Sequence, residues 1–103
     1  MQKQMTLEEF ATHVHTRFQI DSPTGIELEL VYVKDNSNAK IEQFSLIFAG
    51  PAFPVLPQGT YMLRHAAMGE VALFIVPIGP KDSRMEYESA FARLIQQPVA
   101  RVD

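Results

Sequence analysis

The stretch that most constrains the fold runs from Phe44 to Tyr61, with the sequence FSLIFAGPAFPVLPQGTY. The alternation in Phe44–Ala49 is typical of a strand, and a second strand is predicted to begin at Thr60. Prolines at positions 51, 54 and 57 lie between them. Because a proline cannot donate to a strand ladder and restricts the residue before it, Gly50–Gly59 is predicted to be a loop joining two strands.

Alternation of apolar and polar residues predicts strands on both sides of this stretch. The clearest example is Ile26–Val33, and Thr16–Ile20 and Ile41–Ala49 alternate in the same way. The face of the first of these that is expected to point inward consists of Ile26, Leu28, Leu30 and Tyr32. Ala66–Gly69 is short enough to connect two strands of a hairpin.

The segment Glu70–Pro77 is apolar on both faces beyond Val71. This pattern predicts a central strand or one that lies beneath another layer. Gly79–Ser83, with the sequence GPKDS, is predicted to be the following turn.

Residues Met85–Gln96 fit two kinds of structure. Ser83 and Glu86 have the spacing of a capping box, and apolar residues follow at helical spacing. Alternation from Glu86 to Phe91 also fits a strand. The pattern alone favours a helix by a small margin.

Near the N-terminus, Thr6-Leu7-Glu8-Glu9 is a capping box, with Thr6 as the N-cap. It predicts a short helix over Leu7–His13, which must dock on the rest of the domain because an isolated helix of this length is unstable. We expect a flexible tail at 1–5, one β-rich domain at 6–96 and a second tail at 97–103.

These segments together predict a mainly β fold. A chain of 103 residues has room for one core. The expected architecture is a small antiparallel β-barrel or sandwich with an N-terminal capping helix over one open end, an arrangement that protects sheet edges.

Composition and charge argue against several partners and compartments. Nine basic and twelve acidic residues give a net charge of -3, and no basic stripe exists, so nucleic-acid binding is not expected. The acidic N-terminus lacks the apolar segment of a signal peptide, and no apolar run is long enough to span a bilayer. We therefore expect cytoplasmic synthesis without membrane insertion, with incorporation into an extracellular or phage-like assembly left open.

Candidate catalytic and metal-binding residues are few. The chain has no cysteine, which excludes thiolate metal sites and cysteine nucleophiles. His13 and His15 form at most half of a metal site, since two ligands do not complete one. His65 lies on the predicted inward face of its strand, where a hydrogen-bonded core or rim histidine is favoured over a catalytic base.

Two pairs of glutamates, Glu27/Glu29 and Glu86/Glu88, are spaced so that both members point the same way on a strand. Close, buried carboxylates can carry acid–base chemistry, but these alternate with apolar residues and are expected on the solvent face. Motifs for a serine nucleophile or a phosphate-binding loop are absent. We predict no enzyme activity, no catalytic residues, no metal and no cofactor.

Phe53 is the aromatic residue without an expected place in the core. It lies between Pro51 and Pro54 in the predicted loop, where its ring either caps the core or forms an exposed anchor for a partner. The residues predicted for such an interface are Phe53, Val55, Leu56, Gln58 and Tyr61.

The sequence also resembles a known family. The motifs T-L-E-E-F, F-S-L-x-F-x-G-P and V-L-P-Q-G-x-Y-x-L, followed by LFIVPIG and MEYESAF, are similar to a family of small bacterial domains of unknown function. Relatives with this pattern end in a short strand-like segment, although Ser89-Ala90 departs from it. On this resemblance we predict a strand over about Met85–Phe91.

The resemblance also has an implication for function. Members of that family are often encoded beside tail-collar or microcystin-dependent fibre-like proteins. It implies a non-enzymatic structural or protein-interaction module, a component or accessory of a phage-tail-like or surface-fibre assembly, with a homo-oligomer or a fibre-like protein as partner. The alternative is a small-ligand-binding β-barrel with Tyr61 and His65 at its mouth.

Overall fold

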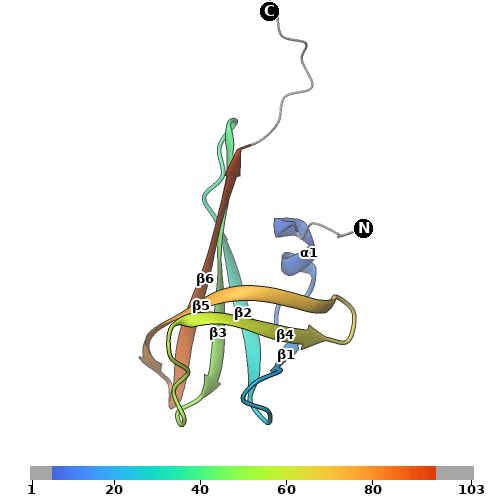
Figure 1. Ribbon diagram of the computed structural model, residues 1–103. Coiled ribbons are helices and arrows are strands. Elements are labelled where there is room, and N and C mark those ends of the chain that lie inside the picture. The colour runs from blue at the N-terminus through green and yellow to red at the C-terminus, as the bar shows by residue number, and fades with distance from the viewer. Residues whose placement is uncertain (1–5, 95–103) are drawn as a thin grey trace, which may run out of the picture.

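The computed structural model describes residues 6–94, which form one short helix and six strands (Figure 1). In chain order the elements are α1 (Leu7–Thr12), β1 (Arg17–Ile20), β2 (Glu27–Asp35), β3 (Ile41–Pro51), β4 (Gly59–His65), β5 (Gly69–Lys81) and β6 (Arg84–Leu94). The tails predicted at 1–5 and 97–103 lie outside the described residues.

The six strands close into a barrel in the order β1-β2-β3-β6-β5-β4, and every neighbouring pair is antiparallel. This confirms the mainly β fold and identifies it as a barrel rather than a sandwich. The pairing of β3 with β6 extends over the full length of both strands, from Ile41 opposite Leu94 to Pro51 opposite Arg84. The loop predicted at Gly50–Gly59 is shorter in the structure, because Gly50 and Pro51 pair with β6 as the end of β3 and Gly59 begins β4. It consists of residues 52–58, here called the β3–β4 loop.

The ring closes where β1 meets β4. Only two residue pairs form this contact, Gln19 with Arg64 and Ile20 with Leu63. The N–H of Asp21 adds a hydrogen bond of 2.9 Å to the carbonyl oxygen of Met62. The β1–β4 seam is therefore the shortest pairing in the ring.

The N-terminal helix forms as its capping box predicts. The Thr6 side chain accepts from the N–H of Glu9, and the Glu9 carboxylate accepts from the N–H of Thr6, each at 3.1 Å. Phe10, the buried residue of α1, lies with its ring 6.2 Å from that of Phe44 and 5.8 Å from that of Phe91. The helix thus covers one end of the barrel with an aromatic contact (Figure 1).

The barrel interior is filled by apolar side chains from every strand. Phe18 and Phe48 meet edge to face at 5.5 Å, a favourable geometry for aromatic rings. The buried cluster consists of Phe10, Phe18, Ile20, Ile26, Leu28, Leu30, Phe44, Leu46, Phe48, Leu56, Leu63, Val71, Leu73, Ile75 and Tyr87.

In β2 the predicted inward face is correct up to Leu30 and wrong for Tyr32. The pairing with β3 shifts between Leu30 and Tyr32, because a β-bulge adds a residue to β2. One extra residue moves the following side chains to the opposite face. Tyr32 is therefore 47% exposed, and Val33 packs against the core in its place.

Of the two alternatives predicted for β5, the structure has the first, a central strand between β4 and β6. Its outer face is open at Phe74, which is 49% exposed. The turn predicted after this strand needs correction. Gly79–Ser83 is not a turn: β5 continues to Lys81 with a bulge between Pro77 and Gly79, where φ of Gly79 is 129°. The turn is formed by Asp82 and Ser83, both of which have positive φ.

The ambiguous C-terminal segment is a strand. β6 confirms the strand predicted over Met85–Phe91 and extends it to Leu94. Within residues 6–94, the structure contains no helix of the length and apolarity that crossing a membrane requires.

Candidate interaction site

The β3–β4 loop carries the most exposed large apolar side chain of the described chain. Phe53 is 84% exposed, and Val55, two residues later, is 44% exposed. Gln58 is also exposed, and Tyr61 at the start of β4 is half-buried. Four of the five residues predicted for an interface are thus accessible to a partner, and the ring of Phe53 does not cap the core.

Leu56, the fifth predicted residue, is 2% exposed and belongs to the core. Its backbone N–H donates to the phenolic oxygen of Tyr87 at 2.8 Å in buried surroundings. One apolar side chain and one buried hydrogen bond therefore fix the middle of the loop to the barrel. The side chain of Leu56 is not available for contact with another molecule.

A second contact holds the end of the loop. The hydroxyl of Tyr61 donates to the carbonyl oxygen of Pro57. Because prolines at 51, 54 and 57 also restrict the backbone, few conformations are open to the loop. An aromatic side chain on such a loop is presented to solvent in a largely preorganised position, which lowers the entropy cost of binding.

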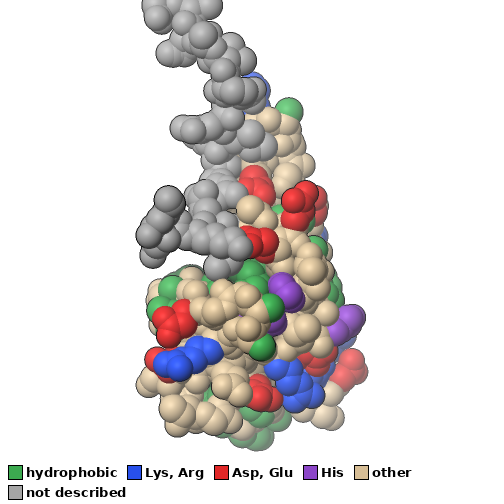
Figure 2. Space-filling view, turned by 90° about the vertical axis from the view of Figure 1, so that its right-hand side faces the viewer, with side chains coloured by type: hydrophobic (Ala, Val, Ile, Leu, Met, Phe, Trp, Pro, Cys, Tyr) green, Lys and Arg blue, Asp and Glu red, His purple; other side chains and the backbone are tan. Residues whose placement is uncertain are grey.

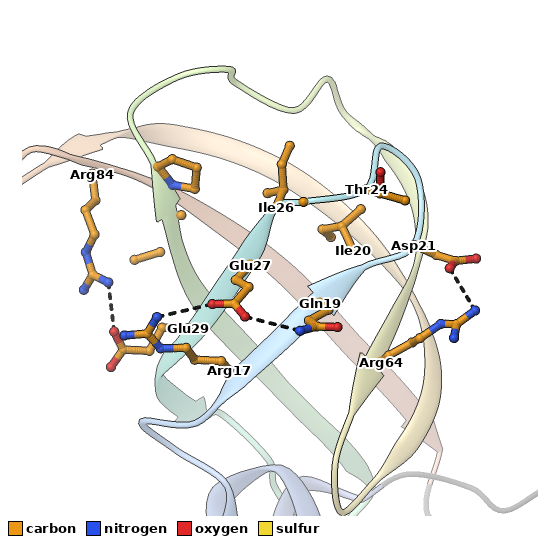
Figure 3. Close-up of a pocket in the computed structure, with 14 residues that line it drawn as sticks. Arg17, Gln19, Ile20, Asp21, Thr24, Ile26, Glu27, Glu29, Arg64 and Arg84 are labelled. Carbon is orange, nitrogen blue, oxygen red and sulfur yellow. Dashed lines mark hydrogen bonds and ion pairs between the residues drawn. The ribbon is translucent and has the colours of Figure 1, made fainter.

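A polar pocket of about 730 Å³ lies beside the start of this loop (Figure 3). Its walls come from β1, β2, the turn after β1, the end of β3, and single residues of β4 and β6. The lining residues are Arg17, Gln19, Ile20, Asp21, Thr24, Gly25, Ile26, Glu27, Glu29, Ala49, Gly50, Pro51, Arg64 and Arg84. Neither Tyr61 nor His65 lines it, so this pocket is not the barrel mouth expected for a ligand-binding barrel.

Every arginine of the pocket is paired with a carboxylate. Arg17 lies 3.3 Å from Glu27, and Arg64 lies 2.9 Å from Asp21. Arg84 contacts Glu29 at 2.8 Å, and this hydrogen bond is the main reason why the pKa of Glu29 is lowered. The pocket therefore presents balanced charge rather than a field of one sign.

The glutamate pairs predicted from spacing lie on the outside of the barrel, on the two strands that flank β3. Ala49 of β3 is paired with Glu29 on one side and Glu86 on the other. Glu88, two residues after Glu86 on β6, lies opposite Ile47 of β3. The carboxylates are half-buried or exposed, as the alternation predicted, and Arg84 contacts Glu29 of the β2 pair.

His65 is a hydrogen-bonded rim histidine, as predicted. Its Nε2 lies 2.8 Å from the hydroxyl of Thr16, and its Nδ1 accepts from the N–H groups of Ala67 and Met68. Its ring is 4.4 Å from that of Phe18 and 4.7 Å from that of His13. Burial, and then the charge of His13, lower the pKa of His65.

The two members of the His13/His15 pair point to different partners. His13 packs on His65, whereas Nδ1 of His15 lies 3.5 Å from the Glu29 carboxylate. Among residues 6–94, no group of three histidine, aspartate or glutamate side chains is close enough to hold a metal ion. Figure 2 shows histidines on a face where basic and acidic side chains are interspersed.

Sequence reasoning missed two features of the site. One is the role of Tyr87. Nothing near it in the sequence indicated that its hydroxyl would accept a hydrogen bond from Leu56, 31 positions away. The polar pocket was also missed, because its residues come from five strands and the turn after β1, and most of its charged residues look like ordinary solvent-facing residues in their own segments.

Comparison with known protein families identifies the family of the chain. A family model described as a domain of unknown function (DUF6916) matches residues 5–91. No curated protein and no solved structure matches the chain.

Proposed function

The chain belongs to the DUF6916 family of domains of unknown function, and from this premise we propose that it is a non-enzymatic protein-interaction module that binds its partner through the β3–β4 loop. The observation that carries the proposal is the exposure of Phe53, which is 84% on a loop whose middle is anchored in the core. Exposed aromatic anchors of this kind dominate the energetics of many protein interfaces.

The anchoring is what separates this loop from an ordinary exposed loop. Tyr87 and Leu56 fix its middle, and Tyr61 fixes its end to Pro57. The contacts are directed toward the barrel and leave Phe53 and Val55 free, so the loop's stability does not depend on burying them. An exposed ring adds no buried apolar surface to the folded chain itself. A partner with an apolar pocket, however, would meet a ring that is already held in position.

The partner that we propose is a fibre-like protein of a phage-tail-like or surface-fibre assembly, of which this domain is a component or accessory. Support comes from the resemblance of the sequence motifs to domains encoded beside such proteins. The balanced charge of the neighbouring pocket agrees with a polar rim around an apolar contact.

A photo-crosslinking amino acid at position 53, introduced in the native host, tests this proposal. The matched control is the same amino acid at position 74, because Phe74 is also an exposed aromatic residue but lies on β5. Crosslinks to a fibre-like protein from position 53 and not from position 74 are expected. Equal adducts from both positions, or none from position 53, would contradict the proposal.

Co-purification gives a second, independent measurement. We expect the Phe53→Ala variant to lose the fibre-like protein that the unmodified chain retains, with an unchanged melting temperature. Retention of the partner at wild-type level by this variant would show that the loop is not the binding site.

Binding of a small ligand is the second candidate, and the observation in its favour is the polar pocket rather than a barrel mouth at Tyr61 and His65. Its guanidinium groups would recognise a carboxylate or a phosphate, although each must first be separated from its own carboxylate partner. Titration of the chain with inorganic phosphate and with a dicarboxylate, followed by amide shifts of Arg17 and Arg84, tests it. Unchanged amide positions would eliminate this candidate.

A further inference from the structure

The three strands β2, β3 and β6 extend past the closed ring as an arm (Figure 1). β5 pairs with β6 only as far as Glu88, while β3 continues to pair with β6 up to Leu94. From Ser89 to Leu94, therefore, no strand of the described chain lies on the other side of β6. We call this side the β6 edge.

The direction of the backbone groups on the β6 edge follows from one hydrogen bond. The N–H of Asn36 donates to the carbonyl oxygen of Gln43 at 2.8 Å, so Gln43 and the alternate residues after it face β2. Phe44 and Leu46 then face β6, where Phe91 and Ser89 lie opposite them.

The backbone groups of Arg93, opposite Glu42, face β3 in the same way as those of Ser89 and Phe91. The remaining residues of this part of β6 point their backbone groups the other way. They are Ala90, Ala92 and Leu94. Their N–H and C=O groups face the open side, which agrees with Glu88, two residues earlier, facing β5. A row of unpaired donors and acceptors at alternate residues is a template for one more strand.

The edge has few of the features that usually block such pairing. Ala90 and Ala92 are exposed and uncharged, Arg93 is the one charged residue of the segment 89–94, and no proline or bulge occurs there. The opposite edge of the arm is different, because Lys34 and Asp35 place charges on it and a bulge precedes them. Charges and bulges protect natural sheet edges, so the β6 edge, with one charged residue and no bulge, is the less protected of the two.

We propose that a second copy of this chain adds its own β6 to the β6 edge, antiparallel and centred on Ala92. Ala90 then lies opposite Leu94 of the second copy, and the two Ala92 residues face each other across a two-fold axis. Each facing pair exchanges both N–H···O=C bonds. The backbone groups of these three residues are therefore all hydrogen-bonded to the same three residues of the second copy. The small side chain of Ala92 suits the axis, where the same side chain of both copies must fit side by side.

The contact goes beyond the proposed function and does not depend on it, because Phe53 lies in the β3–β4 loop rather than on the arm. It joins the two arms into one continuous sheet from β2 of one copy to β2 of the other. Since it involves one short strand per copy, the interface is small and the dimer forms reversibly with concentration.

Sedimentation and light scattering over a concentration range from about 1 µM to about 1 mM test the dimer. We expect a mass of one chain at the low end and two chains at the high end. Ala92→Pro removes an N–H that does not bind β3 and should weaken association at least about tenfold without unfolding the chain. Ala92→Lys, which keeps the N–H and adds a charge, should do the same.

Ala72→Lys is the matched control, because it adds the same charge to an exposed alanine on β5, and it should dimerise like the unmodified chain. Hydrogen exchange at the Ala92 amide should slow as concentration rises. A single chain at all concentrations would overturn the proposal. So would dimers of Ala92→Lys with unchanged affinity, or loss of the dimer in Phe53→Ala but not in Ala92→Lys.

Discussion

The phenolic oxygen of Tyr87 accepts a hydrogen bond of 2.8 Å from the backbone N–H of Leu56, in a buried position that joins β6 to the β3–β4 loop. Without this acceptor, the Leu56 N–H would be buried and unpaired, which is costly. One hydroxyl group therefore links the fold of the barrel to the conformation of the loop that carries Phe53.

The Tyr87→Phe variant should lower the free energy of unfolding by about 1–3 kcal/mol, because it removes the acceptor and leaves the donor buried. Urea denaturation measures this. Tyr61→Phe is the matched control: its hydroxyl donates to an exposed carbonyl that water can reach, so the loss should be about 0.5 kcal/mol or less. Equal stability of Tyr87→Phe and the unmodified chain would show that the loop moves to find another partner.

Leu46→Ala and Phe53→Ala should differ sharply in stability. Leu46 is fully buried, so its truncation leaves a cavity and should cost about 2–5 kcal/mol. Phe53 is largely exposed, so its truncation should change stability by about 0.5 kcal/mol or less. Thermal melts of both variants check this, and a Phe53→Ala variant that melts like the core variant would show that the ring packs on the barrel.

Gly50→Ala should destabilise the barrel by about 1–3 kcal/mol through overpacking. A Cβ at this position would lie 2.6 Å from Cδ2 of Leu28 and 3.6 Å from Cε1 of Tyr87. Gly59→Ala is the control, since its Cβ would meet nothing closer than 3.9 Å, and it should be near neutral. In a double-mutant cycle with Leu28→Ala, the combined loss measured by denaturation should be smaller than the sum of the two single losses.

His65 should make stability depend on pH. Its pKa in the fold is lower than its usual value of 6.5, so the unfolded chain binds the proton more readily. Stability should be fully present above about pH 6.5 and should fall as the pH drops from there toward the folded pKa. Protonating Nδ1 also removes the acceptor used by the N–H groups of Ala67 and Met68.

The measurement is the urea midpoint between about pH 5 and pH 8, a range in which histidine titrates and most carboxylates do not. The control is His65→Asn, because an asparagine oxygen can accept the same N–H groups but does not titrate. Its profile should be flatter than that of the unmodified chain. An equally steep profile would assign the pH dependence to another group.

Most of the strands could be predicted from the sequence because they follow from local alternation. The exception is β6, for which the pattern alone favoured a helix and only the family resemblance indicated a strand. The capping box at Thr6 and the inward face of β2 up to Leu30 needed nothing beyond neighbouring residues. Tyr32 and Gly79 could not be placed correctly, because a bulge depends on how a strand meets its partner rather than on its own pattern. Pairing of β3 with β6 is likewise a contact between distant segments.

The β3–β4 loop, too, could be predicted only in part. Flanking prolines correctly indicated that Phe53 lies outside a strand, and the structure leaves its ring exposed. Val55 and Leu56 are both apolar and lack a periodic context, so the sequence did not indicate which would turn inward. The deciding contact is with Tyr87, which is remote in the sequence.

The short β1–β4 seam has a consequence for the motions of the native barrel. Side-chain contacts span both of its ends, with Thr16 and His65 at one and Asp21 and Arg64 at the other. With so few backbone pairs between them, the ring should open first at this seam during native fluctuations. The barrel should therefore separate along the line between β1 and β4 while the long β3–β6 ladder is still paired.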